Sequence, residues 1–456
     1  MSIDRTQIAV IGAGIVGIAC ARCASAHGHG TRVLIIDPRP PMSLTSAASG
    51  ENYRNWWPHP TMTAFTDLSI YLMEEIARKS RNRIRMTRRG YVLATRQADP
   101  AALLAQLEVG YGNGHAGYLR VHTAGASSTY GAAEIADWEG APDGVDVVQD
   151  RRLIRHHFPS FDPEIATLLH IRRAGDVSGQ QLGALMLEEL RARGSAVKPA
   201  RVVAIEKGSD FLLTLQGKDG IERLRAEIVV NAAGPHLAEI AAFLGEPLPI
   251  INVFQQKIAF IDHDRAVDRK MPFSIDLDGQ RLDWTDDERA MLQEDPATRR
   301  LTAPMPGSIH CRPEGGEQGK WIKLGWAYNR TPSEPTDDPP KDPAFPEIVL
   351  RGASRLNPRL KRYYGRLPKQ MSHYGGYYTM TKENWPLIGP LSTHGAFVAG
   401  ALSGFGTMGA CATGALCAQW IHDLPRPAFA SQLSLARYHD PEMMRQLLRS
   451  ADAGIL

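Results

Sequence analysis

Three glycines near the start of the chain have the spacing of a phosphate-binding turn. The hexapeptide GAGIVG places Gly12, Gly14 and Gly17 in a G-x-G-x-x-G pattern, with Asp37 at the tip of the next apolar segment. Glycine at these positions allows a tight turn, close approach of the backbone to a pyrophosphate, and close packing of a helix on a strand. An acid about twenty residues further on binds ribose hydroxyls. The pattern predicts a dinucleotide-binding site.

The segments around this turn are those that such a site requires. Residues 7–11 (QIAVI) and 32–36 (RVLII) are continuous apolar runs, as in strands buried on both faces of a sheet. Between them, residues 18–27 predict a helix whose N-terminus offers free N–H groups and a positive dipole end to phosphates. The charge of Asp37 disfavours the 2′-phosphate of NADP, so FAD and NAD remain as candidates.

A second cluster of chemically active side chains lies in SGENYRNWWPHP, residues 49–60. Neither helix nor strand periodicity organises this loop. Arg54 is a candidate for binding a substrate carboxylate, because its planar guanidinium makes two parallel hydrogen bonds to such a group. Trp56 and Trp57 are candidates for a pocket wall. A structural ion pair of Arg54, and core packing of at least one indole, are the alternatives.

Composition excludes several other classes of protein. The net charge is +3 and the basic residues are scattered, which argues against nucleic-acid binding. The N-terminus lacks signal-peptide regions, and glycines interrupt the least polar stretch, 386–421, so no integral membrane segment is expected. Five cysteines make no disulfide framework, and Cys20 and Cys23 are interpreted as core residues of a helix. We expect a cytoplasmic protein without a metal site.

The rest of the chain alternates between helix and strand patterns. Residues 201–205, 211–215 and 227–231 read as strands, and the pattern from 248 to about 323 is β-like. One helix interrupts it: Thr285 and Glu288 form a capping-box pattern, and the helix is expected to stop near Pro296. This helix could be a lid over an active site or part of a subunit interface. A Pro- and Asp-rich connector follows at 331–346, and a last helix is predicted around 407–422.

These patterns predict an α/β fold, α+β overall, with a Rossmann-type dinucleotide-binding domain and a β-rich domain. The family resemblance described below implies that the first domain binds FAD and is interleaved with the second, which binds the substrate. The predicted FAD-binding segments are 1–90, 150–245 and 365–425. The predicted substrate-binding segments are 91–149 and 246–364, and residues 426–456 form a C-terminal extension.

Five segments together resemble the D-amino-acid oxidase, glycine oxidase and sarcosine oxidase superfamily of FAD-dependent oxidoreductases. They are GAGIVG with IIDPRP, TSAASG (45–50), AGDVSGQQLGALMLEELRARGSAVKPARVVAIEKG (174–208), VVNAAGPHLAEI (229–240) and GGYYTMTKENWPLIGPLSTHGAFVAGALSGFGTMGACATGALCAQWI (375–421). The last two are the most specific, because they fit poorly with a dehydrogenase that binds only NAD.

The resemblance implies FAD as cofactor and, position by position, the residues that hold it. These are Gly12, Gly14, Ile15, Val16, Gly17, Asp37, Pro38, Arg39, Thr45, Ser46, Ser49, Gly50, Val202, Ala233, Gly234, Gly404, Gly406, Thr407 and Met408. Some relatives attach FAD covalently through a His or a Cys. Here SAASGENYR contains no His, and Gly376 stands near the expected Cys, so non-covalent FAD is predicted. Met408 replaces a lysine that holds the substrate carboxylate in sarcosine-oxidase-like enzymes.

The resemblance also implies the reaction: oxidation of the C–N bond of a small amine or amino acid by hydride transfer to flavin N5. The resulting imine hydrolyses, and oxygen or another acceptor removes the electrons. Expected substrate-site residues are Arg54, Trp57, Arg312 and Tyr378, with Lys257 as a candidate for assisting reaction with oxygen. Alternatives are an FAD-dependent 2-hydroxy-acid dehydrogenase and a flavin-carrying subunit of a hetero-oligomeric amine dehydrogenase. The sequence is compatible with an oligomer.

Overall fold

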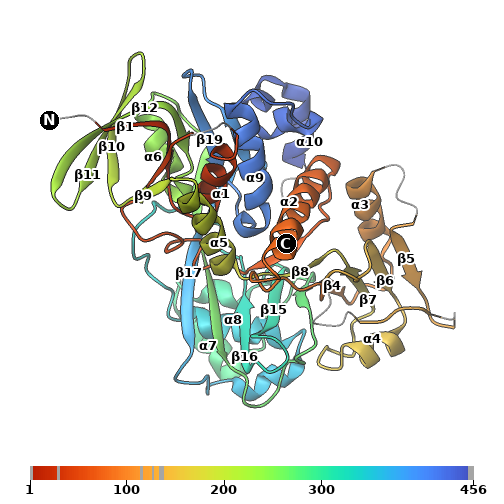
Figure 1. The fold of residues 1–456 in the computed structure, drawn as a ribbon. Coiled ribbons are helices and arrows are strands. Elements are labelled where there is room, and N and C mark those ends of the chain that lie inside the picture. Colours follow the sequence, from red (N-terminus) through yellow and green to blue (C-terminus); the bar gives the residue numbers. More distant parts are fainter. Residues whose placement is uncertain (1–3, 28–30, 113–116, 126–127, 133–137, 450–456) are drawn as a thin grey trace.

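The computed structural model describes residues 4–27, 31–112, 117–125, 128–132 and 138–449. Two large β-sheets divide this part of the chain (Figure 1). The first sheet and the helices packed on it occupy the upper half of the view, and the second sheet occupies the lower half. The chain passes between the two sheets several times, which confirms the predicted fold class.

The first sheet contains the predicted dinucleotide-binding unit. Within the described residues its strand order is β10-β11-β12-β1-β2-β9, with β19 beside β12 and β18 beside β19. The strands are β1 (Asp4–Ile11), β2 (Val33–Ile36), β9 (Ala196–Lys198), β10 (Arg201–Lys207), β11 (Phe211–Gly217), β12 (Gly220–Asn231), β18 (Leu387–Pro390) and β19 (Ala396–Gly400). β1 pairs in parallel with both β2 and β12 and therefore lies inside the sheet, and its apolar residues from Ile8 to Ile11 are buried.

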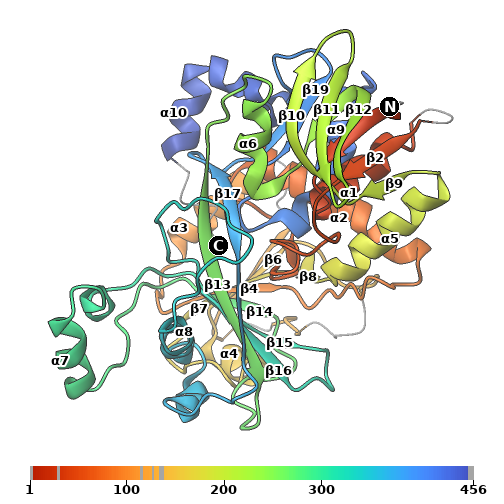
Figure 2. The same ribbon diagram turned by 90° about the vertical axis from the view of Figure 1, so that its left-hand side faces the viewer.

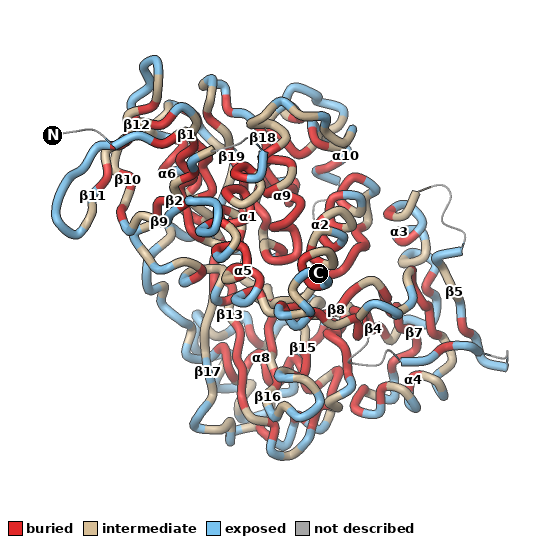
Figure 3. Tube along the Cα trace, in the orientation of Figure 1, coloured by how far each residue is buried: buried red, intermediate tan, exposed pale blue. Residues whose placement is uncertain are grey.

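Two helices rich in small residues pack on this sheet, α1 (Ile15–Ala24) and α9 (Gly406–Ile421). They approach so closely that a Cβ on Gly414 would lie 2.5 Å from the carbonyl oxygen of Ala19. α5 (Gly179–Ala192) and α2 (Pro60–Lys79) complete the helical layer. Figure 3 shows the resulting core as a continuous buried region through α1, α9 and the adjoining strands.

The second sheet carries the β-rich domain. Its order among the described residues is β17-β13-β16-β15-β14-β4-β7-β6-β5. The strands are β4 (Tyr91–Thr95), β5 (Leu119–His122), β6 (Val145–Val148), β7 (Thr167–Ile171), β13 (Ile250–Ile261), β14 (Phe273–Asp276), β15 (Ile309–Glu314), β16 (Trp321–Gly325) and β17 (Ser372–Thr381). β7 and β17 lie in segments that the sequence assigned to the FAD-binding domain (150–245 and 365–425). Both strands pair within the second sheet.

The predicted capped helix is present as α7 (Asp286–Glu294). The Thr285 hydroxyl accepts from the Glu288 N–H, and the Glu288 carboxylate accepts from the Thr285 N–H, as a capping box requires. Arg351 of α8 (Phe345–Ser354) ties the helix to the domain through a 2.6 Å ion pair with Glu288. α7 lies at the outer edge of the β-rich domain, away from the first sheet (Figure 2).

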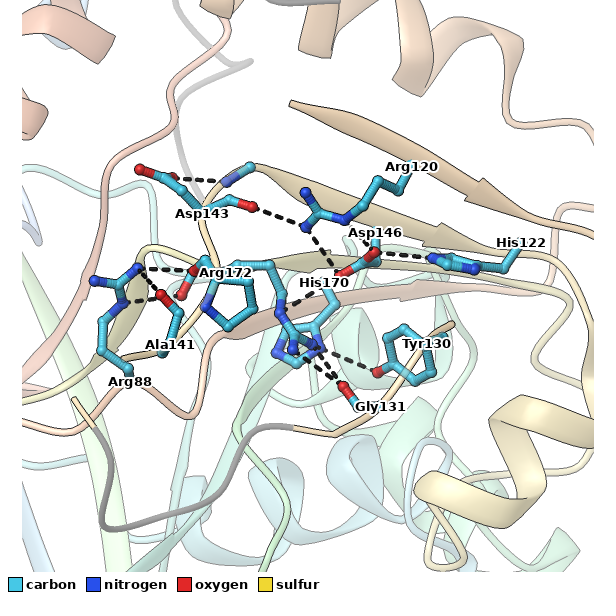
Figure 4. Close-up of polar contacts among 12 residues, drawn as sticks. Arg88, Arg120, His122, Tyr130, Gly131, Ala141, Asp143, Asp146, His170 and Arg172 are labelled. Carbon is cyan, nitrogen blue, oxygen red and sulfur yellow. Dashed lines mark hydrogen bonds and ion pairs between the residues drawn. The ribbon is translucent and has the colours of Figure 1, made fainter. Parts of the chain in front are cut away.

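A buried polar network fastens the far edge of the second sheet (Figure 4). Asp146 pairs with Arg120 at 2.7 Å and with Arg172 at 3.4 Å. His122 stands between the Ser128 hydroxyl and Asp146, at 2.9 Å from each, which is the linear order of a nucleophile triad. The two arginines neutralise Asp146, however, and Ser128 also accepts from the Tyr130 N–H. We therefore interpret the network as structural.

The residues predicted as a C-terminal extension fold back onto the first domain. After 3₁₀ turns at Ala428–Leu433 and Leu435–His439 the chain ends its described part in α10 (Pro441–Arg449). Arg437 is buried, and its Nε lies 2.7 Å from the equally buried Glu383 carboxylate, which also accepts from Tyr438. This pair links the C-terminal segment to the chain between β17 and β18.

Replacing Arg437 by alanine is expected to lower the free energy of unfolding by about 3–5 kcal/mol, because it leaves Glu383 charged, buried and unpaired. Arg445→Ala is the matched control. Arg445 pairs with Glu442, but both side chains are more than half exposed, so the expected loss is below about 1 kcal/mol. Urea unfolding of the three proteins measures the difference, and equal midpoints for the two variants would contradict it.

Candidate active site

An elongated cavity of about 1000 Å³ runs along the carboxyl ends of β1, β2 and β12. At such an edge the loops of a parallel sheet bind ligands. Most of the residues predicted to hold a cofactor line it: Gly12, Gly14, Ile15, Val16, Asp37, Arg39, Thr45, Ser46, Ser49, Gly50, Ala233, Gly234, Gly404, Gly406 and Thr407. Pro38 and Val202 line a smaller cavity that adjoins it at Asp37 and Arg39.

The three motif glycines have different surroundings at this turn. Gly12 has a φ of +111°, and a Cβ there would lie 2.3 Å from the Ala232 carbonyl oxygen at the end of β12. Gly17 does not line the cavity; its Cα packs so closely on the turn that a Cβ would lie 1.9 Å from the Gly12 carbonyl oxygen. Gly14 borders the cavity, so its bare backbone is accessible to a ligand.

Side chains from two loops complete this end of the cavity. The Asp37 carboxylate accepts from the Ala13 N–H at 2.8 Å and from the Arg39 N–H at 2.9 Å. These two bonds hold it at the end of β2, where a ribose-binding acid is expected. The Ser46 hydroxyl accepts from the Ile15 N–H at 3.0 Å, which fastens the 45–50 loop to the first turn of α1.

The opposite end of the cavity is formed by the start of α9. Phe405 precedes the helix and makes no side-chain cap, so the first N–H groups of α9 have no partner from its own cap residue. The Thr407 and Ser49 hydroxyls are 2.8 Å apart, which joins this helix start to the 45–50 loop. A bare glycine turn at one end and a positive helix end at the other fit a flavin dinucleotide.

A second cavity, of about 1170 Å³, opens beside the first. The two share a wall made of Ser49, Gly50, Lys257, Tyr378, Ser403, Gly404 and Thr407. Arg54, Trp57 and Tyr378, three of the four predicted substrate-site residues, line the second cavity. The α7 helix contributes no lining residue to either one, so in this structure it does not act as a lid.

Sheet register explains which side chains of the β-rich domain reach the shared wall. Lys257 of β13 stands opposite Gly325 of β16, which stands opposite His310 of β15, so all three occupy one row on one face. Gly325 leaves room for the imidazole, since a Cβ there would lie 2.2 Å from His310 Nε2. No motif in the sequence selects His310, because only the pairing of distant strands places it beside Lys257.

Arg54 is the most unusual side chain in the second cavity. It is 1% exposed, and neither Nη1 nor Nη2 makes a hydrogen bond to any described residue. Its guanidinium carbon lies 4.8 Å from the Trp57 ring centre, 5.0 Å from that of Tyr91 and 5.9 Å from that of Trp56. Burial lowers its pKa, an effect that the Tyr91 phenol opposes. Its Nε donates to the Trp56 carbonyl at 3.1 Å, and no carboxylate of a described residue forms an ion pair with it.

Three other ionisable side chains that line the second cavity differ in charge. Lys257 donates to the Ala48 carbonyl at 3.1 Å, and burial together with Lys323 lowers its pKa to about 8. Burial and the charge of Lys257 lower the pKa of His310 to about 3, so this imidazole is neutral. Burial raises the pKa of Tyr378 to about 12, which keeps its phenol protonated.

The other predicted residues take different places. Arg312 lines neither cavity; it pairs with Glu314 at 2.7 Å and lies 3.5 Å from Asp176 and 3.7 Å from Glu51. Trp56 belongs to the core, where its indole packs on Gly110. Met408 faces the second cavity instead of the first, and its sulfur accepts from the Arg54 N–H at 3.1 Å.

Comparisons with known proteins agree with this geometry. A family model described as FAD dependent oxidoreductase matches residues 7–420. No curated protein matches the sequence. Within the described residues, no helix combines the length and apolar character that a membrane crossing requires.

Several solved structures share the fold at low sequence identity. Glycine oxidase from Geobacillus kaustophilus superposes with a TM-score of 0.70 at 17% identity, over 95% of this chain and 99% of that one. L-proline dehydrogenase from P. horikoshii superposes with a TM-score of 0.69 at 16% identity, over 96% of this chain and 99% of that one. Iminodiacetate oxidase from Chelativorans sp. BNC1 superposes with a TM-score of 0.64 at 16% identity, over 94% of this chain and 98% of that one.

Proposed function

Because this chain belongs to the family of FAD-dependent oxidoreductases, we propose that it oxidises the C–N bond of an amine that carries a carboxylate. The observation that carries the proposal is Arg54, a buried and unpaired guanidinium in the cavity beside the cofactor cavity. A substrate carboxylate supplies the missing anion. Bound FAD supplies the acceptor for a hydride from the carbon next to nitrogen, and the imine formed is hydrolysed by water.

The residues of the second cavity bind and orient such a substrate. Arg54 holds the carboxylate with its two free Nη groups, and the rings of Trp57 and Tyr91 exclude water from this contact. His310 is neutral, so a ring nitrogen can accept a hydrogen bond from the substrate N–H. The phenol of Tyr378 stays protonated at the wall that both cavities share.

The charges around this cavity favour the reactive form of an amine. Arg54, Lys257 and Arg330 line it, against one carboxylate, Glu51. A surplus of positive charge makes the binding of a substrate ammonium less favourable and the binding of a carboxylate more favourable. An amino acid therefore binds with its amine unprotonated, and only that form can lose a hydride from the adjacent carbon. No strong general base is needed.

We propose that FAD is bound without a covalent link. The described lining of the first cavity contains neither His nor Cys, and Gly376, near the position of a covalent Cys in some relatives, borders the cavity without a side chain. Acid precipitation of the purified protein is expected to release all the flavin into the supernatant. Yellow colour that stays with the denatured pellet would show a covalent bond.

The proposed reaction is tested by anaerobic mixing of the holoenzyme with candidate substrates. Amino acids and N-alkyl amino acids are expected to bleach the flavin absorbance near 450 nm, roughly the band of oxidised flavin. Bleaching only by 2-hydroxy acids would support the alternative dehydrogenase. Absence of bleaching until partner chains are added would support a flavin-carrying subunit.

Arg54→Ala is expected to lower kcat/KM for a carboxylate substrate, because one partner of a buried charge pair is lost. The expected decrease corresponds to about 2–5 kcal/mol of lost transition-state stabilisation. Turnover of an amine that lacks the carboxylate serves as the control and should change little. The variant should be at least as resistant to heat as the parent, since an unpaired buried charge is removed. Unchanged kcat/KM for both substrate classes would remove Arg54 from the site.

Lys257 predicts a pH dependence of reaction with oxygen. Its lowered pKa of about 8 means that the ammonium is present below pH 8 and is lost as the pH rises through 8. The rate constant for oxygen consumption by the pre-reduced protein should fall over the same range, since positive charge assists electron transfer to oxygen. Lys257→Met should be slow at every pH, whereas Lys270→Met, an exposed control, should keep the parent profile. Identical profiles for all three proteins would contradict this role.

A further inference from the structure

The second cavity contains two arginines without a carboxylate partner among the described residues: Arg54, which is buried, and Arg330, which is exposed. Glu51, the carboxylate in the lining, does not balance either one. One of its oxygens accepts from the Gly179 N–H at 2.8 Å, and the other lies 3.7 Å from Arg312 and 3.8 Å from Lys323. The cavity therefore has two unmatched arginine charges at different depths.

The position of Arg330 is fixed by its neighbour Asn329. The Asn329 side-chain amide donates to the Phe254 carbonyl at 3.0 Å, and the backbone carbonyl of Asn329 accepts from the Gln255 side-chain amide at 2.8 Å. Both partners belong to β13, the strand that also carries Lys257. The segment that bears Arg330 is therefore held against β13, and its side chain is kept at the rim of the cavity.

Apolar groups also line this cavity. Phe273, Leu277, Pro306 and Ala327 line it, together with Trp57. The second cavity extends from the buried Arg54 to the exposed Arg330. An amino acid with a single carboxylate at Arg54 and a very short side chain leaves this outer part, and the charge of Arg330, without a partner.

We infer that the substrate is an amino dicarboxylate, with one carboxylate bound by Arg54 and a second bound at the cavity rim by Arg330. The inference rests on the proposed function and narrows its substrate class. The reacting carbon and nitrogen lie at the shared wall, near Lys257 and Tyr378, while the methylene chain contacts the apolar walls. Arg330 is thus a specificity-determining residue, because its contact is to a part of the substrate that does not react.

The test compares how tightly unreactive monocarboxylates and dicarboxylates of different chain length bind. The holoenzyme is titrated with matched pairs of equal chain length, butanoate and succinate, pentanoate and glutarate, hexanoate and adipate, and binding is read from the perturbed flavin spectrum. At one chain length the dicarboxylate should bind about fivefold more tightly than its monocarboxylate, the upper range for a solvent-exposed ion pair. This preference should shrink as ionic strength rises, since Arg330 is exposed.

Arg330→Gln should remove the preference and leave the monocarboxylate dissociation constants within about twofold. Arg223→Gln, a substitution of an exposed arginine on β12 of the other sheet, should change neither the dicarboxylate preference nor the monocarboxylate dissociation constants. Tight monocarboxylate binding with no preference at any chain length would overturn the inference and leave the proposed function standing. Equal weakening of both series by Arg330→Gln would overturn it too, as general electrostatic attraction. If neither series perturbs the flavin, the proposed function fails together with it.

Discussion

The backbone contact between the turn after β1 and the end of β12 is the constraint on which the cofactor cavity depends. β1 and β12 are paired in register from Asp4–Leu224 to Ile11–Asn231, so both strands deliver their carboxyl ends to the same point. There the Gly12 Cα meets the Ala232 carbonyl so closely that no side chain fits. A larger residue at position 12 would push the turn away from β12, and α1 and the 45–50 loop that it holds would move with it. The small residues of α1 and α9 follow from the same requirement, because α9 must pack on α1 to bring its N-terminus to the cavity.

The second cavity depends on a different constraint, the cost of an unpaired charge. Arg54 is placed by short elements: β3 (Asn52–Arg54) pairs with β8 (Ala174–Asp176), and Met408 accepts from the Arg54 N–H. Three aromatic rings around the guanidinium give partial compensation through cation–π contacts. They do not replace the hydrogen bonds that Nη1 and Nη2 lack. In the proposed function a bound carboxylate offsets this cost, and part of the stability lost at this position is then recovered as affinity for the anion.

The parts of the site that the sequence revealed are those made by local segments. Gly12, Gly14, Gly17 and Asp37 lie within one β–α–β unit, and their spacing fixes their geometry whatever the rest of the chain does. Arg312 and His310 show where such reasoning stops. Both lie on β15, two residues apart, and therefore on one face of the sheet. Only the register with β16 decides that His310 stands in the row of Lys257, whereas Arg312 stands opposite Lys323 among carboxylates. The same limit applies to β7 and β17, since strand patterns do not state which sheet a strand joins.

The face of the second sheet that borders the cofactor cavity carries both glycines and basic side chains. Gly325 of β16 stands opposite Lys257, in the same row, and leaves room for the His310 imidazole. Gly376 of β17 stands opposite Gln255 and lies against Thr45 and Ala48 of the 45–50 loop. The same face of the sheet carries an ammonium, a neutral imidazole and a protonated phenol, those of Lys257, His310 and Tyr378. None of the three carries a negative charge at neutral pH. A wall of this kind stabilises negative charge that develops beside it and disfavours a cationic amine, which are the two electrostatic conditions that removal of a hydride from a neutral amine requires. The β-rich domain thus contributes the charge pattern of the site, while the dinucleotide domain contributes its shape.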